Sequence, residues 1–245
     1  MDDLDYLAAV RADSAALARA ARVGLEAPVP ACPGWSVADL VLHTGYVQRH
    51  KATVVRERLR RPPRATDFPA APSPDRLIEW FEEGAADLTA TLEGTDPATP
   101  VWTFHEPDQT AGFWRRRMAH ETAVHRADAE SAHGEIAPVV PAALASDGVD
   151  EVLWTMLSRL RNARPGNGET VHLHCTDTEG EWLLTLQPDR VDVRDGHARA
   201  DCAARGAASD LLLFVWGRLP AARLEVLGDG DLLARVRRLA VEATQ

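Results

Sequence analysis

The sequence predicts a mainly α-helical protein with more than one domain, in which a four-helix bundle is followed by a small α+β domain. In the first part of the chain, four long segments carry apolar residues at helical spacing. In the second part, short segments of alternating apolar and polar residues lie between helical segments. We therefore expect one domain at residues 1–135 and another at residues 141–245, with a proline-containing break between them.

The helices of the first domain have recognisable starts and stops. Ser36 can cap the second helix, with Asp39 as an acidic partner at its third position. That helix should stop before the prolines at 62–63, and Gly134 should end the fourth. The four helices are expected at residues 3–22, 37–59, 75–92 and 110–133.

The second domain is expected to begin with a helix over residues 141–160. The segments ETVHLHCTD and EWLLTLQPD alternate in polarity and predict two strands around a turn at residues 179–180. RVDVRDG is a third strand candidate. Two further helices are predicted at residues 207–216 and 229–241, which completes an α+β unit of about a hundred residues.

The composition argues against several classes of partner. A formal net charge of -10 opposes nucleic-acid binding, because phosphates are neutralised by lysine and arginine. The one basic cluster, residues 56–64, ends a predicted helix, where cations suit the helix dipole. No apolar run reaches the length of a bilayer span, and the acidic first residues are unlike a secretory signal. We therefore expect a cytoplasmic protein with no membrane partner.

Three cysteines and no CxxC motif argue against a disulfide framework and against a cysteine-based zinc site. Cys32, which stands just before Pro33, has two interpretations. It is either a nucleophile or a small buried apolar residue, and the second use of a single cysteine is the more common.

The segment RRRMAHETAVHRADAE carries the strongest chemical signal. Its histidines, His120 and His125, are five residues apart and point about 140° apart on a helix, unlike the four-residue spacing of zinc proteases. Glu121 and His125 share a helical face, where a carboxylate and an imidazole can hold one metal ion. They can equally form an ordinary surface pair on a helix.

A catalytic metal site needs a third protein ligand and one open position. His43 on the second helix is flanked by Leu40 and Val47 at helical spacing, which places it on or near the buried face. His50, two turns further on, competes for this role. The alternative for His43 is a core histidine with a structural hydrogen bond.

Three blocks of sequence resemble the mycothiol-dependent maleylpyruvate isomerase family. They are CPGWSVADLVLHTG, FWRRRMAHETAVHRADAE, and AARGAASDLLLFVWGRLP followed by LGDGDLL. The blocks stand in the family's order and span most of the chain. The resemblance implies a DinB-like four-helix bundle followed by a smaller α+β domain of sterol-carrier-like type.

The resemblance also implies a ligand set and a cosubstrate. A divalent metal, usually zinc, would be bound at the positions of His43, Glu121 and His125, and mycothiol would be the thiol cosubstrate. Arg218, in the WGR block, would either reach toward the site or lie at a helix end with its charge in solvent. Two further roles have equally ordinary alternatives: Trp35 lines the pocket or belongs to the core, and Asp128 orients a ligand histidine or pairs with an arginine.

These assignments predict a metal-dependent, mycothiol-dependent S-transferase or maleylpyruvate-type isomerase. A thiol bound at the metal would be deprotonated and would attack a small electrophile. The alternatives are a metal-dependent hydrolase that activates water and a non-catalytic small-molecule binding protein with a structural metal. The sequence leaves open the electrophile, the choice among zinc, nickel and manganese, and whether the chain is a monomer or a weak homo-oligomer.

Overall fold

The structure is a computed structural model that describes residues 4–64, 70–134, 138–160 and 166–244. The chain divides into two compact units, Met1–Pro138 and Val139–Gln245, and each is described by itself. The described residues form seven α-helices and one five-stranded sheet, and the sheet belongs to the second unit. The predicted fold class, a helical part followed by an α+β part, is confirmed. Within the described ranges, no helix is long and apolar enough to cross a membrane.

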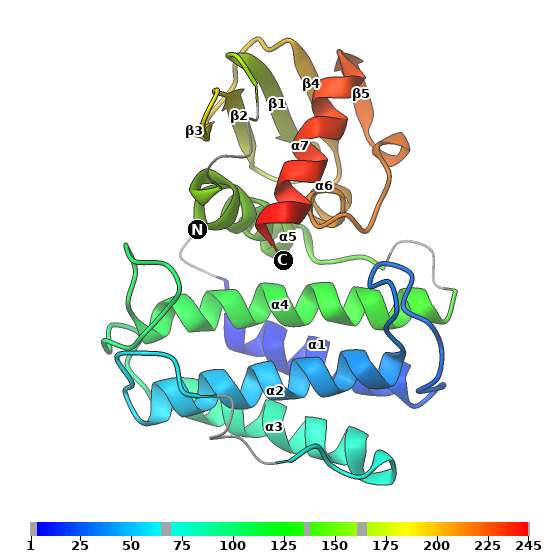
Figure 1. Ribbon diagram of the computed structural model, residues 1–245, viewed down its shortest axis with the longest axis vertical. Helices are drawn as coiled ribbons and strands as arrows, with labels where there is room; N and C mark the ends of the chain where they lie inside the picture. Colours follow the sequence, from blue (N-terminus) through cyan, green and yellow to red (C-terminus); the bar gives the residue numbers. More distant parts are fainter. Residues whose placement is uncertain (1–3, 65–69, 135–137, 161–165, 245) are drawn as a thin grey trace. The chain divides into compact units, whose positions relative to one another are not determined.

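The first unit is built from four helices, each within a few residues of its predicted position. They are α1 (Tyr6–Ala21), α2 (Val37–Arg56), α3 (Leu77–Glu93) and α4 (Ala111–Ala132). Both α1 and α2 pack against α3 and α4 (Figure 1). Large apolar side chains such as Leu17, Leu40 and Phe81 are fully buried between the helices.

The starts of α2 and α4 are set by local sequence. Ser36 Oγ accepts a hydrogen bond from the backbone N–H of Asp39 at 3.2 Å, and the Asp39 carboxylate accepts one from the Ser36 backbone at 2.9 Å. This is the predicted capping box. Thr110 caps α4 by accepting from the backbone of Phe113 at 3.4 Å. These caps fix which side chains the two helices present to one another.

The end of α2 differs from the prediction, because the helix stops at Arg56 and not near Leu59. Arg58 adopts a positive φ of 50°, and the Leu59 backbone donates a hydrogen bond to the carbonyl of Val54 at 3.0 Å. This left-handed ending satisfies the last carbonyl groups before the prolines are reached. The turn itself therefore ends the helix, within the basic cluster.

The second unit contains a mixed sheet whose strand order is β3-β2-β1-β4-β5. β1 and β4 are parallel, and the other neighbouring strands are antiparallel. The three predicted strands are present, but the prediction missed β4 and β5. β4 is rich in alanine and glycine, and β5 is short and largely exposed, so neither has a strong strand pattern. The strands are β1 (Glu169–Cys175), β2 (Glu181–Leu186), β3 (Val191–Asp195), β4 (Cys202–Gly206) and β5 (Glu225–Gly228).

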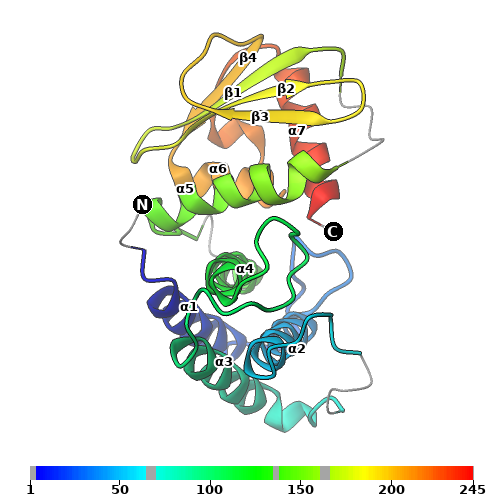
Figure 2. The ribbon, with the colours of Figure 1, turned by 90° about the vertical axis from the view of Figure 1, so that its left-hand side faces the viewer.

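Three helices of the second unit, α5 (Ala142–Glu151), α6 (Ala208–Val215) and α7 (Gly230–Ala243), lie on one side of the sheet (Figure 2). The single helix predicted over residues 141–160 is only partly right. α5 passes into a π-helical turn, Val152–Met156, and a short 3-10 turn, Leu157–Arg159, and apolar spacing does not distinguish these hydrogen-bond patterns.

The side chains of β1 alternate between the two faces of the sheet. Val171 and Leu173 are fully buried on the face that packs against α6 and α7. His172 and His174 point to the opposite face, because successive strand residues alternate. This second face of the sheet therefore carries polar side chains, including two histidines.

Candidate metal centre

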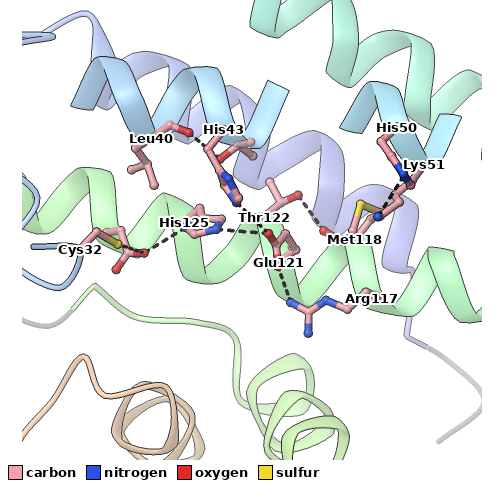
Figure 3. A network of polar contacts seen from close by, with 12 residues as sticks. Cys32, Leu40, His43, His50, Lys51, Arg117, Met118, Glu121, Thr122 and His125 are labelled. Carbon is pink, nitrogen blue, oxygen red and sulfur yellow. Dashed lines mark hydrogen bonds and ion pairs between the residues drawn. The ribbon is translucent and has the colours of Figure 1, made fainter. Parts of the chain in front are cut away.

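The strongest candidate site lies between α2 and α4. His43 projects from α2, and Glu121 and His125 project from α4 one turn apart (Figure 3). Glu121 Oε1 lies 3.6 Å from His43 Nε2 and 3.2 Å from His125 Nε2. The ligand atoms of all three side chains lie within 4.8 Å of one another. The fold thus brings together the three residues that the sequence proposed as ligands.

His125 is oriented through its second ring nitrogen. Its Nδ1 lies 3.0 Å from Oδ2 of Asp128, whose side chain is fully buried, so the Nδ1–H can donate to this carboxylate. This tautomer leaves the Nε2 lone pair directed toward Glu121 and His43. The geometry matches the interpretation in which Asp128 orients a ligand histidine. The Cys32 sulfur lies 3.8 Å from the same Asp128 oxygen, at the edge of the cluster.

Glu121 is held between cationic partners. Its Oε2 accepts a hydrogen bond from Arg117 at 2.8 Å. Burial favours the neutral acid, but His125, His43 and Arg117 outweigh burial and hold the pKa of Glu121 well below its usual range. Burial also disfavours the charged form of His125, yet Glu121 and Asp128 raise its pKa to about 9. The cluster therefore attracts positive charge, which a proton or a metal ion can supply.

The donor set fits a divalent ion. Two imidazole nitrogens and one carboxylate oxygen suit zinc and several other divalent metals. The His43 side chain is 39% exposed, compared with 10% for His125, so the cluster is reachable from the His43 side. The ring of Trp35 lies 5.0 Å from that of His43, measured between centroids, and neighbours this exposed side. Three protein ligands with one accessible side are typical of catalytic metal sites.

Two other histidines singled out in the sequence lie apart from this cluster. His120 is fully buried, and its ring meets that of Tyr6 edge-on at 6.2 Å between centroids. It therefore points away from His125, as the helical angle predicts. His50 lies beside Lys51 and Trp102, and burial lowers its pKa to about 4. The described ligand atoms grouped around Glu121 do not include His50.

Sequence reasoning overlooked Arg117 and Lys51. Arg117 stands four residues before Glu121, a spacing that brings opposite charges together on a helix. Lys51 is the only lysine in the chain, and its ammonium lies 4.5 Å from the ring centroid of Trp114. Burial lowers the pKa of Lys51 to about 8, although Glu121 opposes the shift. Both cations help to set the charge around Glu121.

Arg218 belongs to the second unit and follows α6. Its guanidinium donates a hydrogen bond to the backbone oxygen of Trp216 at 2.6 Å and lies 5.5 Å from the centroid of that ring. Both of these contacts of the Arg218 side chain are with Trp216, within the second unit. A role for Arg218 in binding the thiol remains a prediction.

Comparison with known proteins gives the family. Residues 7–130 match the family described as the mycothiol maleylpyruvate isomerase N-terminal domain, and residues 143–235 match the MDMPI C-terminal domain. Two crystal structures of the mycothiol-dependent maleylpyruvate isomerase, one of them of a mutant, share the fold. The mutant has a TM-score of 0.65 at 13% sequence identity, and the other structure has a TM-score of 0.63 at 14%; each comparison covers 91% of both chains.

Among the curated proteins, none matches this chain. The two domain matches nevertheless occupy most of the sequence, in the order expected from the three resembling blocks. The first match contains the His43, Glu121 and His125 cluster, and the second contains Arg218. The chain belongs to the mycothiol maleylpyruvate isomerase family.

Proposed function

We propose that this protein is a metal-dependent enzyme that uses mycothiol to attack a small electrophile, as an isomerase of the maleylpyruvate type or as an S-transferase. Family membership supports the use of mycothiol and isomerase chemistry. The observation that carries the metal assignment is the convergence of His43, Glu121 and His125, with Asp128 behind His125. Zinc is the ion we expect, because two imidazoles and a carboxylate with an accessible side suit it.

Each residue of the cluster has a separate task in this proposal. His43, Glu121 and His125 would hold the ion, which when bound lowers the pKa of a thiol and so supplies a thiolate at neutral pH. Asp128 would keep the His125 ring in the ligating tautomer. Arg117 would hold the second oxygen of Glu121, so that this carboxylate keeps a single orientation.

The reaction on maleylpyruvate follows from thiolate chemistry. The sulfur adds to one carbon of the cis double bond, which becomes a single bond, and the electron pair moves onto the neighbouring carbonyl. Rotation about that single bond, followed by return of the electrons and loss of the thiolate, gives the trans isomer and regenerates the thiol. With an electrophile that cannot expel the sulfur, proton uptake leaves a thioether, which is the S-transferase outcome.

Arg218 is our candidate for holding the polar parts of mycothiol. A guanidinium can donate several hydrogen bonds to hydroxyl, amide or carboxylate oxygens. Binding energy from these remote groups would position the sulfur for attack. Arg218 would then be a binding residue for the thiol and not a ligand to the metal.

The decisive experiment measures maleylpyruvate isomerisation and thioether formation with mycothiol, without a thiol, and with glutathione as a matched control. We expect turnover only with mycothiol, loss of turnover after chelation, and recovery on adding Zn²⁺. Conversion of the electrophile to a hydrolysis product without any thiol would replace the proposal with a metal-dependent hydrolase. Substrate found covalently attached to Cys32 by mass spectrometry would replace it with a protein-thiol mechanism.

A further inference from the structure

A second group of side chains that could bind a metal lies in the second unit, on the face of the sheet opposite α6 and α7. His172 and His174 are two residues apart on β1, so they share this face. Glu181 on β2 is paired directly with His174. His197 lies two residues after the end of β3, and its side chain contacts Glu181. Strand pairing and one short segment therefore gather three imidazoles around one carboxylate.

The distances within this group are those of a compact site. Glu181 Oε2 lies 3.1 Å from His197 Nδ1 and 3.4 Å from His172 Nε2. Its other oxygen, Oε1, lies 2.7 Å from His174 Nδ1. The rings of His172 and His197 are 5.1 Å apart between centroids. The ligand atoms of His172, Glu181 and His197 all lie within 4.8 Å of one another.

The burial of His172 is an independent observation that points to a ligand at this place. Its side chain is only 6% exposed, and its buried Nε2 makes no hydrogen bond to any part of the chain that the structure describes. Its 3.4 Å approach to Glu181 Oε2 is longer than a normal N–H···O hydrogen bond. A buried polar atom without a hydrogen bond is costly, and this one lies within 4.8 Å of the other two ligand atoms.

We propose that His172, Glu181 and His197 form a second binding site, for a divalent first-row transition-metal ion such as Zn²⁺. Imidazole nitrogens favour zinc, nickel and copper over magnesium and calcium, which prefer sets of oxygen ligands. His174 would hold the second oxygen of Glu181 and so orient the carboxylate. A bound ion would tie the segment that carries His197 to strands β1 and β2. This proposal does not depend on the metal or on the reaction assigned to the helical unit.

The experiment uses the full chain without a histidine tag. In a His43→Ala/His125→Ala variant, which lacks two ligands of the helical site, isothermal titration with Zn²⁺ should still show one ion bound per chain. Adding His197→Ala should weaken that binding by about tenfold or more, because one of three ligands is lost. Arg194→Ala, on the exposed end of β3, should leave it unchanged. Mg²⁺ and Ca²⁺ should give no comparable binding.

His197 makes the test robust, because its side chain is 80% exposed and its loss should not disturb folding. In the otherwise unaltered protein, metal analysis after dialysis should find about one zinc ion more per chain than in His197→Ala, whether or not the helical site is filled. The proposal is overturned if the double variant binds no Zn²⁺ while folded. It is equally overturned if binding survives both His197→Ala and Glu181→Gln at full strength.

Discussion

The two histidine–glutamate clusters use the same ligand chemistry in different surroundings. Between α2 and α4, Glu121 is 17% exposed and His125 is 10% exposed, and a separate buried carboxylate, Asp128, holds the His125 ring. On the sheet, His197 is 80% exposed and lies on an irregular segment. The helical cluster is therefore the more enclosed of the two, and a bound ion would restrict the exposed His197 side chain more than the side chains of the helical cluster.

The enclosed cluster between α2 and α4 is the better suited to catalysis. The exposed cluster on the sheet is the better suited to holding the segment that carries His197 in place. Reacting groups have to be held in place, and ligands on two packed helices meet that need better than a ligand on a loop. Arg117 and the single lysine add positive charge near Glu121, which in the proposed reaction would stabilise an anionic sulfur. We expect the two clusters to differ in affinity and in their effect on turnover.

The largest effect should come from His125→Ala. It removes a ligand that is already in position, so the helical site should lose its metal, and thiol-dependent turnover should fall by about a thousandfold, equivalent to several kcal/mol. Metal analysis and isomerisation assays measure both. His133→Ala, at the end of the same helix, is the control. If His125→Ala kept its turnover, the helical cluster would not be the catalytic site.

A smaller effect is expected from the groups behind the ligands. Asp128→Asn should weaken metal binding at the helical site by about 10- to 100-fold, because the amide no longer favours the protonated Nδ1 of His125. His174→Ala, the corresponding change behind Glu181, should weaken the sheet site by less than about tenfold, since that site is more exposed to solvent. Zinc titrations of both variants make the comparison. Equal losses of zinc affinity would mean that the residues that orient the ligand side chains matter equally in the two sites.

Arg218→Ala tests whether the α+β unit contributes to the reaction. We expect thiol-dependent turnover to fall by about tenfold, equivalent to roughly 1.4 kcal/mol, through a higher KM for mycothiol. Metal content and helical circular dichroism should not change. Arg194→Ala, on the same unit, is the matched loss of a guanidinium. An unchanged KM for mycothiol in Arg218→Ala would assign thiol binding to other residues.

The smallest effect concerns stability and Lys51. Its pKa falls from 10.5 to about 8 in the folded protein, so between these values the unfolded chain binds more protons, and stability should rise with pH. Below pH 8 the folded protein carries the cost of a buried charge. Lys51→Met should therefore stabilise the metal-free protein by about 1 kcal/mol at pH 7 and abolish the rise.

Urea unfolding at pH 7 and pH 9.5, with a chelator present, measures this effect. Lys51→Arg keeps the charge but does not titrate in this range, so it should remove the pH dependence without the gain at pH 7. A pH dependence that persisted in Lys51→Met would have to come from another group. Lys51 would then not be the buried charge that makes the stability of the protein depend on pH.

Local sequence predicted the helical unit well because its signals act over a few residues. The Ser36 and Asp39 capping box starts α2, and apolar spacing defines four helices close to their observed bounds. The predicted end of α2 lies too far along the chain, because the left-handed turn that ends the helix is at Arg58 and not at a glycine, the usual sequence signal for such a turn. Strands β4 and β5 were missed because their pairing with distant strands, and not their own composition, makes them strands.

By itself the sequence determined that Glu121 and His125 share one helical face, because a four-residue spacing has only one meaning on a helix. It also contained the three blocks that place the chain in its family. Only the tertiary structure decided that His43 meets this pair and that the sheet gathers histidines around Glu181. Those residues come from separate elements, and their meeting depends on helix packing and strand register, which no local spacing encodes.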